Sequence, residues 1–458
     1  MQERSQESVR DGRQRRGVRS QNIVPAPLLI GLVVAIGFPA GIAAGLAPAA
    51  RAIAFIAIGL VAISAIVDAL RRSRALAGIR VELPALVRFF KDRDAEIRVR
   101  VWNPARNARR VRIGMVAPVG IEAPNEDQQV DLPQGAEAAE FLWRATPRRR
   151  GRYLFDSIYL EAPSPLGLWS VRARQTVAME VRVYPNLRRN QDLKALRRGV
   201  SGVHAMRQIG RGREFEKLRE YAPGDGFDEI HWKATARRGH PITKVFQVER
   251  TQEIYVIIDA SRLSARPAGD ETALERAISA GLIVGAAAER RGDLFGIAAF
   301  SHQVEAFTRA RNGKTHYAAC RDAIYQLQPR AESPDFEEIA TFLRLRLRRR
   351  ALLLFLTSLD DPVLAESFLR ATKLLARKHL VVAGMLRPGS IGPLFRDANV
   401  ETPDDIYHHL AGHLAWKRLR EVEVALGHQG IRLALLDPET FGGALIGLYD
   451  EIKQRQLL

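Results

Sequence analysis

Residues 254–261, which read IYVIIDAS, decide the fold of the C-terminal half of the chain. The first five are apolar and mostly β-branched, which predicts a strand buried on both faces, as in a parallel sheet covered by helices. Asp259, Ala260 and Ser261 follow directly. Small polar side chains at the carboxyl end of such a strand lie where open α/β sheets bind their ligands. The stretch therefore predicts an α/β domain with a candidate site at Asp259.

Four more strand-like runs follow, each separated from the next by a helical pattern. Strands joined by single helices form parallel βαβ units, which predicts a doubly wound sheet over residues 252–458. Neither G-x-G-x-x-G nor G-x-x-x-x-G-K-[ST] opens any of these helices, which argues against ATP binding by this chain itself. The predicted strands are 253–259, 294–300, 352–357, 380–386 and 431–436, and the predicted helices are 270–290, 314–328, 361–378, 404–426 and 439–453.

The N-terminal part of the chain is first basic and then strongly apolar. Residues 1–22 are polar and rich in arginine, which predicts a disordered segment. Residues 23–46 carry no charge, and a second apolar run covers 52–67. As a helix, the first run would span ~36 Å at about 1.5 Å per residue, enough to cross a bilayer. Asp68, near the end of the second run, is expected at the membrane interface.

The distribution of arginine around the two apolar runs predicts their orientation. Positive charge is heavy before the first run and after the second, and only Arg51 lies between them. The positive-inside rule then gives a transmembrane hairpin at residues 23–70 with both ends in the cytoplasm. A cleaved signal peptide ending near Ala47-Pro48-Ala49 is the alternative. In both cases the bulk of the chain faces the cytoplasm.

Residues 76–186 have the pattern of an all-β domain. Ile97, Val99 and Val101 alternate with polar side chains, which predicts a half-buried strand, and a similar alternation recurs near residue 180. Proline, glycine and asparagine separate several such strands, which favours an antiparallel β-sandwich. Residues 187–251 form a basic linker followed by the segment that precedes the central strand.

The net charge of +19 suits nucleic acid, anionic lipid or an acidic protein. Two arginine clusters, at 144–152 and 344–350, are candidate patches, with a solvated face as the default interpretation. Because the second lacks interleaved aromatics and the domain is predicted to be tethered to a membrane, lipid headgroups or an acidic partner fit better than nucleic acid. We therefore expect no nucleic-acid partner, and a membrane-tethered nucleic-acid binder remains a weaker alternative. The single cysteine, Cys320, excludes an intrachain disulfide and a Cys-based zinc site.

The segment before the central strand has a specific order of residues. It reads R-x-Y-x-x-G-D, then I-x-W-K-x-[ST]-A-R, then a strand ending in D-x-S. This order resembles the bacterial family known as domain of unknown function 58, whose C-terminal half is similar to a von Willebrand factor A domain. Asp228 stands where the family often has arginine, and Ser164, in the turn at 164–169, stands where it more usually has aspartate. The signature residues are Arg219, Tyr221, Gly224, Asp225, Trp232, Lys233, Ala236 and Arg237.

The resemblance implies a function without catalysis. It suggests a membrane-anchored adaptor in the bacterial inner membrane, multi-pass, with its bulk in the cytoplasm. The implied partner is an AAA+ ATPase of the MoxR type, in envelope-related assembly or maturation. The signature residues would then contribute to the interaction.

The resemblance also implies a cation site. In von Willebrand A domains a D-x-S-x-S loop holds a divalent cation, and hard oxygen ligands suit Mg²⁺. Here the candidate ligands are Asp259, Ser261 and Ser264, because Leu263 occupies the position of the second serine. Thr315 and Asp360 are candidates for the ligands from other loops. The alternative is N-cap and turn duty for the same side chains. No other cofactor is implied.

One enzymatic alternative stays open. A metal-assisted hydrolase would use Asp259 with the block 225–233, in which His231 would act as general base near Asp225 or Asp228. A zinc site at His408, His409 and His413 lacks the glutamate of H-E-x-x-H and a third ligand, so a helix face is preferred there.

Overall fold

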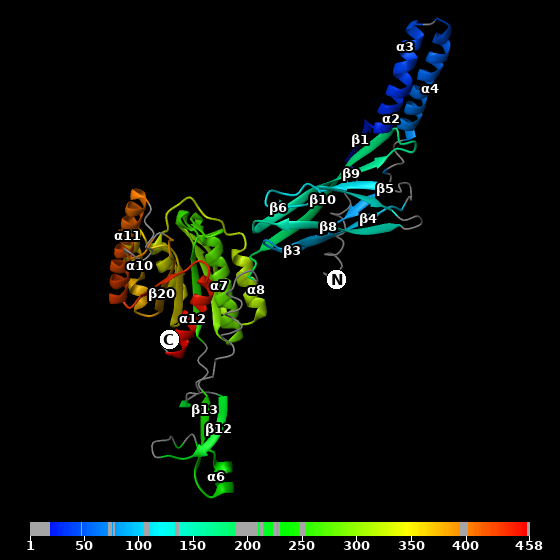
Figure 1. Cartoon of the computed structure of the whole chain (residues 1–458). Coiled ribbons are helices and arrows are strands. Elements are labelled where there is room, and N and C mark those ends of the chain that lie inside the picture. Colours follow the sequence, from blue (N-terminus) through cyan, green and yellow to red (C-terminus); the bar gives the residue numbers. More distant parts are fainter. Residues whose placement is uncertain are drawn as a thin grey trace. The chain divides into compact units, whose positions relative to one another are not determined.

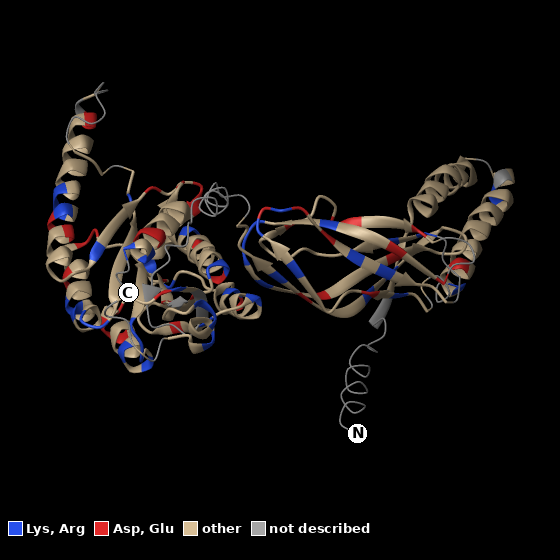
Figure 2. Ribbon diagram, turned by 90° about the horizontal axis from the view of Figure 1, so that it is seen from below, with Lys and Arg blue, Asp and Glu red and all other residues tan. Residues whose placement is uncertain are grey.

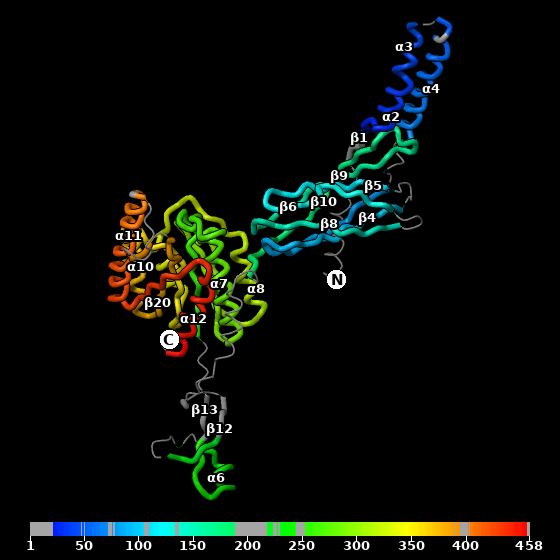
Figure 3. The backbone as a smooth tube through the Cα atoms, viewed as in Figure 1, coloured from blue at the N-terminus to red at the C-terminus, as the bar shows by residue number. Residues whose placement is uncertain are grey.

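The computed structural model describes residues 19–46, 48–71, 76, 78–104, 110–132, 137–187, 209–210, 214–222, 227, 230–247, 252–389, 391–393 and 402–455. Figure 3 traces the path of the chain. It divides into two compact units, Met1–Asn186 and Leu187–Leu458 (Figure 1).

The first unit contains two helical segments that are long and apolar enough to cross a membrane, Pro27–Leu46 and Arg51–Leu70. Figure 2 shows them without charged residues except near their ends. A π-helical turn ends two residues before Pro39, and such a turn accommodates a residue that has no N–H to donate. The elements are α2 (Pro27–Leu32), the π-turn η1 (Val33–Gly37), α3 (Phe38–Leu46), the connecting turn η2 (Pro48–Ala50) and α4 (Arg51–Leu70).

The remainder of this unit is built from strands. They are β1 (Arg19–Pro25), β2 (Arg80–Glu82), β3 (Leu86–Phe90), β4 (Ala95–Trp102), β5 (Arg110–Gly114), β6 (Ile121–Glu122), β7 (Asp127–Asp131), β8 (Ala138–Pro147), β9 (Gly151–Pro163) and β10 (Trp169–Tyr184).

These strands form two sheets around one apolar core. One sheet has the order β1-β10-β9-β5-β7, with β3 also paired to β10, and the other has the order β2-β4-β8-β6. Ile97, Val99 and Val101 of β4 point inward, as their alternation predicts. In the same core Trp143 packs edge-on against Phe155, with ring centroids 5.9 Å apart. The pairing is antiparallel except between β3 and β10, which are parallel.

The N-terminal boundary differs from the prediction. Residues 19–22 were assigned to a disordered segment and 23–25 to a membrane helix, whereas the structure places all of them in β1. The physical reason is that β10 is 16 residues long and offers a free edge, to which β1 pairs antiparallel. Ile23 then packs on the core of the sheets.

A buried polar contact joins α4 to the turn formed by residues 164–169. Asp68 is fully buried, and its carboxylate accepts hydrogen bonds from Ser164 Oγ at 2.5 Å, the Leu166 amide at 2.9 Å and the Leu168 amide at 3.1 Å. Trp169 adds a bond from its indole N–H to the Ala65 carbonyl at 2.8 Å. A buried carboxylate is stable when several donors replace its water, so these contacts hold the turn on the end of α4.

We expect Asp68→Ala to release this turn, because it leaves the amides of Leu166 and of the buried Leu168 without an acceptor. Hydrogen exchange of the full-length protein should show these two amides exchanging at least about ten-fold faster than in the wild type. Asp131→Ala, which removes an exposed ion pair with Arg110 in the same unit, is the control and should leave both rates unchanged. Equal protection in the Asp68→Ala protein would show that other contacts hold the turn.

The second unit is organised around β14. Its described α/β elements are β14 (Glu253–Asp259), η5 (Arg262–Ala265), β15 (Pro267–Ala268), β16 (Glu271–Thr272), α7 (Ala273–Arg290), β17 (Leu294–Phe300), β18 (Val304–Arg311), α8 (Lys314–Ile324), α9 (Phe336–Arg346), β19 (Ala351–Leu356), α10 (Pro362–Ala376), β20 (Leu380–Leu386), α11 (Pro403–His428), β21 (Arg432–Leu436) and α12 (Phe441–Gln454).

Six of these strands form one sheet with helices on both faces. The order is β18-β17-β14-β19-β20-β21, and all neighbours are parallel except β17 and β18. Alternate residues of β14 point to opposite faces. Val256 packs in a core shared with α7, α8 and α12, and Ile257 packs in a core shared with α9, α10 and α11. Figure 1 shows the two helical layers.

Each predicted strand of this half exists, with bounds that agree within one residue. Five further described elements were not predicted: the antiparallel edge strand β18, helix α9, and the short elements η5, β15 and β16. Part of the second arginine cluster, Arg344 and Arg346, forms the last turn of α9, where cations complement the helix dipole.

A buried polar cluster ties α12 to the amino-terminal end of the sheet. Asp293 is 1% exposed and accepts hydrogen bonds from the Tyr449 hydroxyl, from Lys453 Nζ at 2.6 Å and from the Gln252 amide at 3.1 Å. The guanidinium of Arg291 lies over the Tyr449 ring at 4.9 Å. Burial raises the pKa of the Tyr449 hydroxyl, first by desolvation and then by the neighbouring Asp293 charge, so it remains a donor.

We expect Tyr449→Phe to lower the free energy of unfolding of this unit by about 1–2 kcal/mol, because Asp293 loses one buried hydrogen bond. Cys320 provides the measurement. It is fully buried, and burial raises its pKa to about 12, so its thiol reacts only when the unit opens. The urea dependence of thiol labelling should shift to lower urea in Tyr449→Phe. Tyr407→Phe, at a tyrosine that is 71% exposed, should leave it unchanged.

Candidate functional site

The carboxyl ends of β14 and β19 meet at the point where the sheet connections diverge. From β14 the chain runs to β17 on one side, and β19 lies on its other side. Open α/β sheets bind ligands in the crevice at such a switch point. Asp259 ends β14, and Thr357 directly follows β19.

The Asp259 carboxylate is buried and already hydrogen-bonded within the chain. Its side chain is 3% exposed. One oxygen accepts from the Ser261 amide at 2.8 Å and the other from the Thr357 hydroxyl at 2.6 Å. Burial raises the pKa of Asp259, and the hydrogen bonds from Thr357 and Ser261 oppose that shift. The net direction shows that desolvation outweighs the hydrogen bonds.

The two candidate serines have local structural roles. Ser261 caps the short helix η5 by accepting from the Leu263 amide, and Ser264 donates its hydroxyl to the Ser261 carbonyl at 2.7 Å. Leu263, at the position of the second serine of D-x-S-x-S, is buried. The structure therefore brings Asp259, Ser261 and Ser264 together, but uses their polar atoms to shape the turn.

This donor set fits Mg²⁺ poorly. Thr357, not Thr315, bonds Asp259, and Asp360 pairs with Arg266 at 2.7 Å. Within the described ranges no group of three His, Cys, Asp or Glu side chains is placed to hold a metal ion. The cation therefore remains a prediction.

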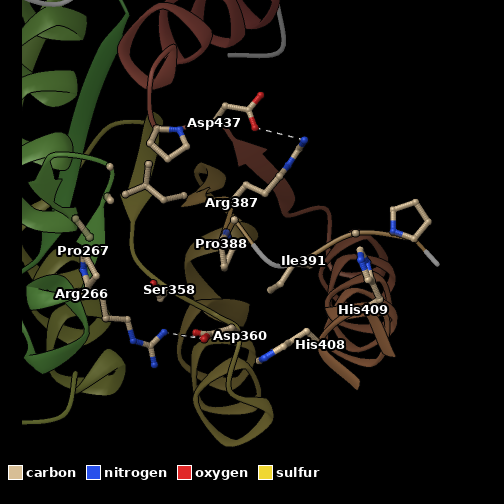
Figure 4. Close-up of a pocket in the computed structure, with 18 of the residues that line it drawn as sticks. Arg266, Pro267, Ser358, Asp360, Arg387, Pro388, Ile391, His408, His409 and Asp437 are labelled. Carbon is tan, nitrogen blue, oxygen red and sulfur yellow. Dashed lines mark hydrogen bonds and ion pairs between the residues drawn. The ribbon is translucent and has the colours of Figure 1, made fainter. Parts of the chain in front are cut away.

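Beside this point lies an open cleft of about 740 Å³. Figure 4 shows two ion pairs on its walls, Arg266 with Asp360 and Arg387 with Asp437, the second at 3.3 Å. Because each arginine is paired with an aspartate, the cleft has no excess of one charge on these walls. Two of the three histidines considered as zinc ligands, His408 and His409, also line this cleft. The third, His413, stacks on Trp416 with ring centroids 5.7 Å apart.

The signature segment forms a small module with its own sheet. Its strands, in the order β11-β13-β12, are antiparallel, and helix α6 packs beside them. Ile230 and Ile242 are buried inside the module. The bounds are β11 (Ile209–Gly210), β12 (Glu214–Glu220), α6 (Trp232–Arg238) and β13 (Ile242–Gln247).

Several signature side chains face solvent. Trp232 is 68% exposed, and Phe227, earlier in the same module, is 75% exposed. Lys233, Ala236 and Arg237 on α6 are exposed too. Of the remaining signature residues, Arg219 is half-buried and donates a hydrogen bond to the Glu220 carbonyl. The Tyr221 ring contacts the Phe227 ring, with centroids 6.1 Å apart. Gly224 and Asp225 lie outside the described residues.

His231 has a structural role in this module. Its Nδ1 accepts a hydrogen bond from the Ala234 amide, with the two nitrogens 3.0 Å apart, and thereby caps α6. That nitrogen is not free to take a proton from a substrate while the cap is in place. The partners proposed for a hydrolase, Asp225 and Asp228, are not among the residues described, so no observed contact supports the hydrolase alternative.

The first arginine cluster is largely paired on the surface of the β-rich unit. Arg144 contacts Glu96, Arg148 contacts Glu122 and Arg152 contacts Glu180. Figure 2 shows acidic and basic residues interspersed on these strands. Such pairing leaves less uncompensated positive charge than the sequence alone implies.

Comparison with known proteins places the signature and the central strand in one family segment. Residues 217–387 match the model of the family described as "Protein of unknown function DUF58". The uncharacterized protein YeaD of Bacillus subtilis is 27% identical over 155 residues, which are 31% of this chain and 37% of YeaD. The matched part therefore spans little more than a third of YeaD.

Two solved structures are also similar. The conserved hypothetical protein BatB of Bacteroides thetaiotaomicron is 12% identical, with a TM-score of 0.28 over 44% of this chain and 99% of BatB. An aerotolerance-related membrane protein of Bacteroides fragilis is 11% identical, with a TM-score of 0.25 over 44% and 99%. These likenesses are too low to carry over a fold or an activity.

We expect Asp259→Asn to fold and to be at least as stable as the wild type at neutral pH, because it removes a buried charge and keeps an acceptor for the Ser261 amide. The raised pKa of Asp259 means that the folded state binds its proton more tightly than the unfolded state does. Wild-type stability therefore falls as pH rises from the ordinary aspartate pKa through the raised one, and is constant above it. The advantage of Asp259→Asn should shrink on acidification, as measured by thermal circular dichroism.

The same thermal assay tests the cation. A ligand that binds only the folded state raises the midpoint of unfolding. A rise with Mg²⁺ in the wild type that is absent from Asp259→Asn would establish the site, whereas equal responses would remove it. An advantage of Asp259→Asn that grows on acidification would contradict the sign derived for Asp259.

Proposed function

We propose that this protein is a non-enzymatic, membrane-anchored adaptor whose signature module docks a partner protein. The observation that carries the proposal is the exposure of Trp232 and Phe227, together with the exposed Lys233 and Arg237 on the same helix as Trp232. Tryptophan and arginine are enriched among the residues that dominate binding energy at protein interfaces. An exposed indole next to positive charge suits an acidic protein surface with an apolar pocket.

The residues at the carboxyl edge of the sheet support the same proposal, because they argue against a catalytic site there. The Asp259 carboxylate is buried and bonded within the chain, and the predicted general base His231 is used as a helix cap. These side chains are better explained as structural than as catalytic groups. In this proposal the six-stranded sheet is a von Willebrand A-type domain that supports the module.

The partner in this proposal is an AAA+ ATPase of the MoxR type, acting in envelope-related assembly or maturation. The reason is division of labour: the sequence has no phosphate-binding loop, so a machine that uses ATP has to be a separate chain. The two apolar helices would anchor the adaptor in the bacterial inner membrane with its bulk in the cytoplasm.

We expect a tagged full-length protein, purified in mild detergent with and without ATP, to recover an AAA+ ATPase that mass spectrometry identifies. Trp232→Ala should lower this recovery at least about ten-fold, as for a central interface residue. Val363→Ala, at a side chain on α10 that is 72% exposed, is the matched control and should have no effect. Asp259→Asn should also leave recovery unchanged, because that carboxylate is buried.

Three outcomes would contradict the proposal. Recovery that ignores Trp232 would remove the module as the contact. No ATPase in either nucleotide state would remove the partner. Hydrolysis of ATP by the purified protein alone would remove the non-enzymatic assignment.

A further inference from the structure

Helix α11 carries an apolar stripe that the described residues of the second unit leave exposed. Ile406, Tyr407, Leu410 and Leu414 are 55, 71, 45 and 49% exposed. An α-helix turns by about 100° per residue, so these four side chains lie within one face ~100° wide. Figure 1 shows α11 at the outside of this unit, beside α10.

The opposite face of α11 accounts for its position in the fold. Leu419 and Leu426 lie on that face and are buried in the core beneath the sheet. The helix is therefore fixed on its inner face and apolar on its outer face over its N-terminal half. Large apolar side chains gathered on one exposed face mark an interaction surface more often than scattered ones do.

The charges flanking the stripe indicate what covers it. Asp404 lies at the N-terminal end, and Lys417 and Arg418 lie ~20 Å further along the same helix at about 1.5 Å per residue. All three are exposed, and none has an ion-pair partner in the part of the chain that the structure describes. The stripe therefore has a negative charge at one end and positive charges at the other. Such a surface is complementary to a second copy of itself in the antiparallel orientation.

We propose that α11 pairs with α11 of a second copy of this chain, antiparallel, about a two-fold axis between Leu410 and Ala411. In this arrangement Asp404 of each copy lies level with Lys417 of the other, with Arg418 adjacent. Tyr407 lies level with Leu414, and the two copies of Leu410 lie next to the axis at the centre. A parallel pair would instead place each charge beside its own copy, which is repulsive at both ends.

The interface is small, and membrane tethering compensates for its size. Two chains held in one bilayer meet at a high effective concentration, so a weak contact suffices. This step rests on the membrane anchoring of the proposed function. The pairing geometry itself rests only on the contacts and charges of α11.

Disulfide trapping of the full-length protein in its membrane tests the geometry. The native Cys320 is fully buried and contributes little background. Leu410→Cys lies at the axis, so mild oxidation should convert most of the protein into a covalent dimer of two copies. Val424→Cys is the matched control. It is 60% exposed on the same helix face, but its distance from the axis leaves its two copies far apart. Only a parallel pair of helices would give a covalent dimer with each of the two cysteine variants.

Charge reversal tests the pairing at the ends. In the Leu410→Cys background, Asp404→Arg should lower dimer formation about five-fold, because it replaces attraction with repulsion. Adding Lys417→Asp, at the position level with residue 404 of the other copy, should restore dimer formation, which a merely destabilised helix would not show.

The remaining outcomes overturn the proposal. No covalent dimer from Leu410→Cys, a cross-link to a different protein, or equal trapping of Leu410→Cys and Val424→Cys would each exclude the antiparallel pair. The recovery of an ATPase through Trp232 is read separately, so either proposal can fail while the other holds. If alkaline extraction releases the protein from the membrane, anchoring has failed, and the same trapping in concentrated solution still decides the geometry.

Discussion

Burial of β14 on both faces is the constraint on which the second unit depends. Ile254 to Asp259 are all buried, so helices have to cover both sides of the sheet, and the chain provides three for each side. Once β14 is central, its neighbours are β17 and β19, and their carboxyl ends surround Asp259. The polar turn at Asp259 is therefore a consequence of the core. A fully buried strand leaves its last side chain close to the interior, where a carboxylate needs donors from its own chain.

The elements that could be predicted from the sequence are those with strong local patterns. Continuous apolar runs identified every parallel strand of the sheet. Helix α9 has an equally clear local signal and could have been predicted, since Asp335 caps it and Phe336, Ile339 and Leu343 follow at helical spacing. Strand β18 had no such signal, because its residues are only half-buried. Strand β1 depends on an edge that β10 provides more than 140 residues later, which local patterns do not show.

The same distinction applies to the polar sites. The rule about strand ends located Asp259 from sequence, but its partner Thr357 depends on the register of β19 beside β14. Asp68 was expected at an interface. Its three donors come from a turn about 100 residues away, in which Ser164 supplies the hydroxyl. Such pairings depend on strand order and tertiary contacts, which cannot be read from the spacing of residues in the sequence. The exposure of Trp232 likewise required the packing of its module to be known.

Three buried aspartates show how this chain separates structure from interaction. Asp68 is satisfied by a turn, Asp293 by Tyr449 and Lys453, and Asp259 by its own loop and Thr357. In each case donors of the same chain form hydrogen bonds to the carboxylate oxygens, so the carboxylate has little remaining capacity to bind a ligand. The aromatic side chains of the signature module and of α11 are arranged in the opposite way, with large apolar area facing water. Exposed aromatic area has a cost in water that binding a partner removes. The functional contacts of this protein are therefore to be sought on its exposed aromatic surfaces, whereas its buried charges hold the fold together.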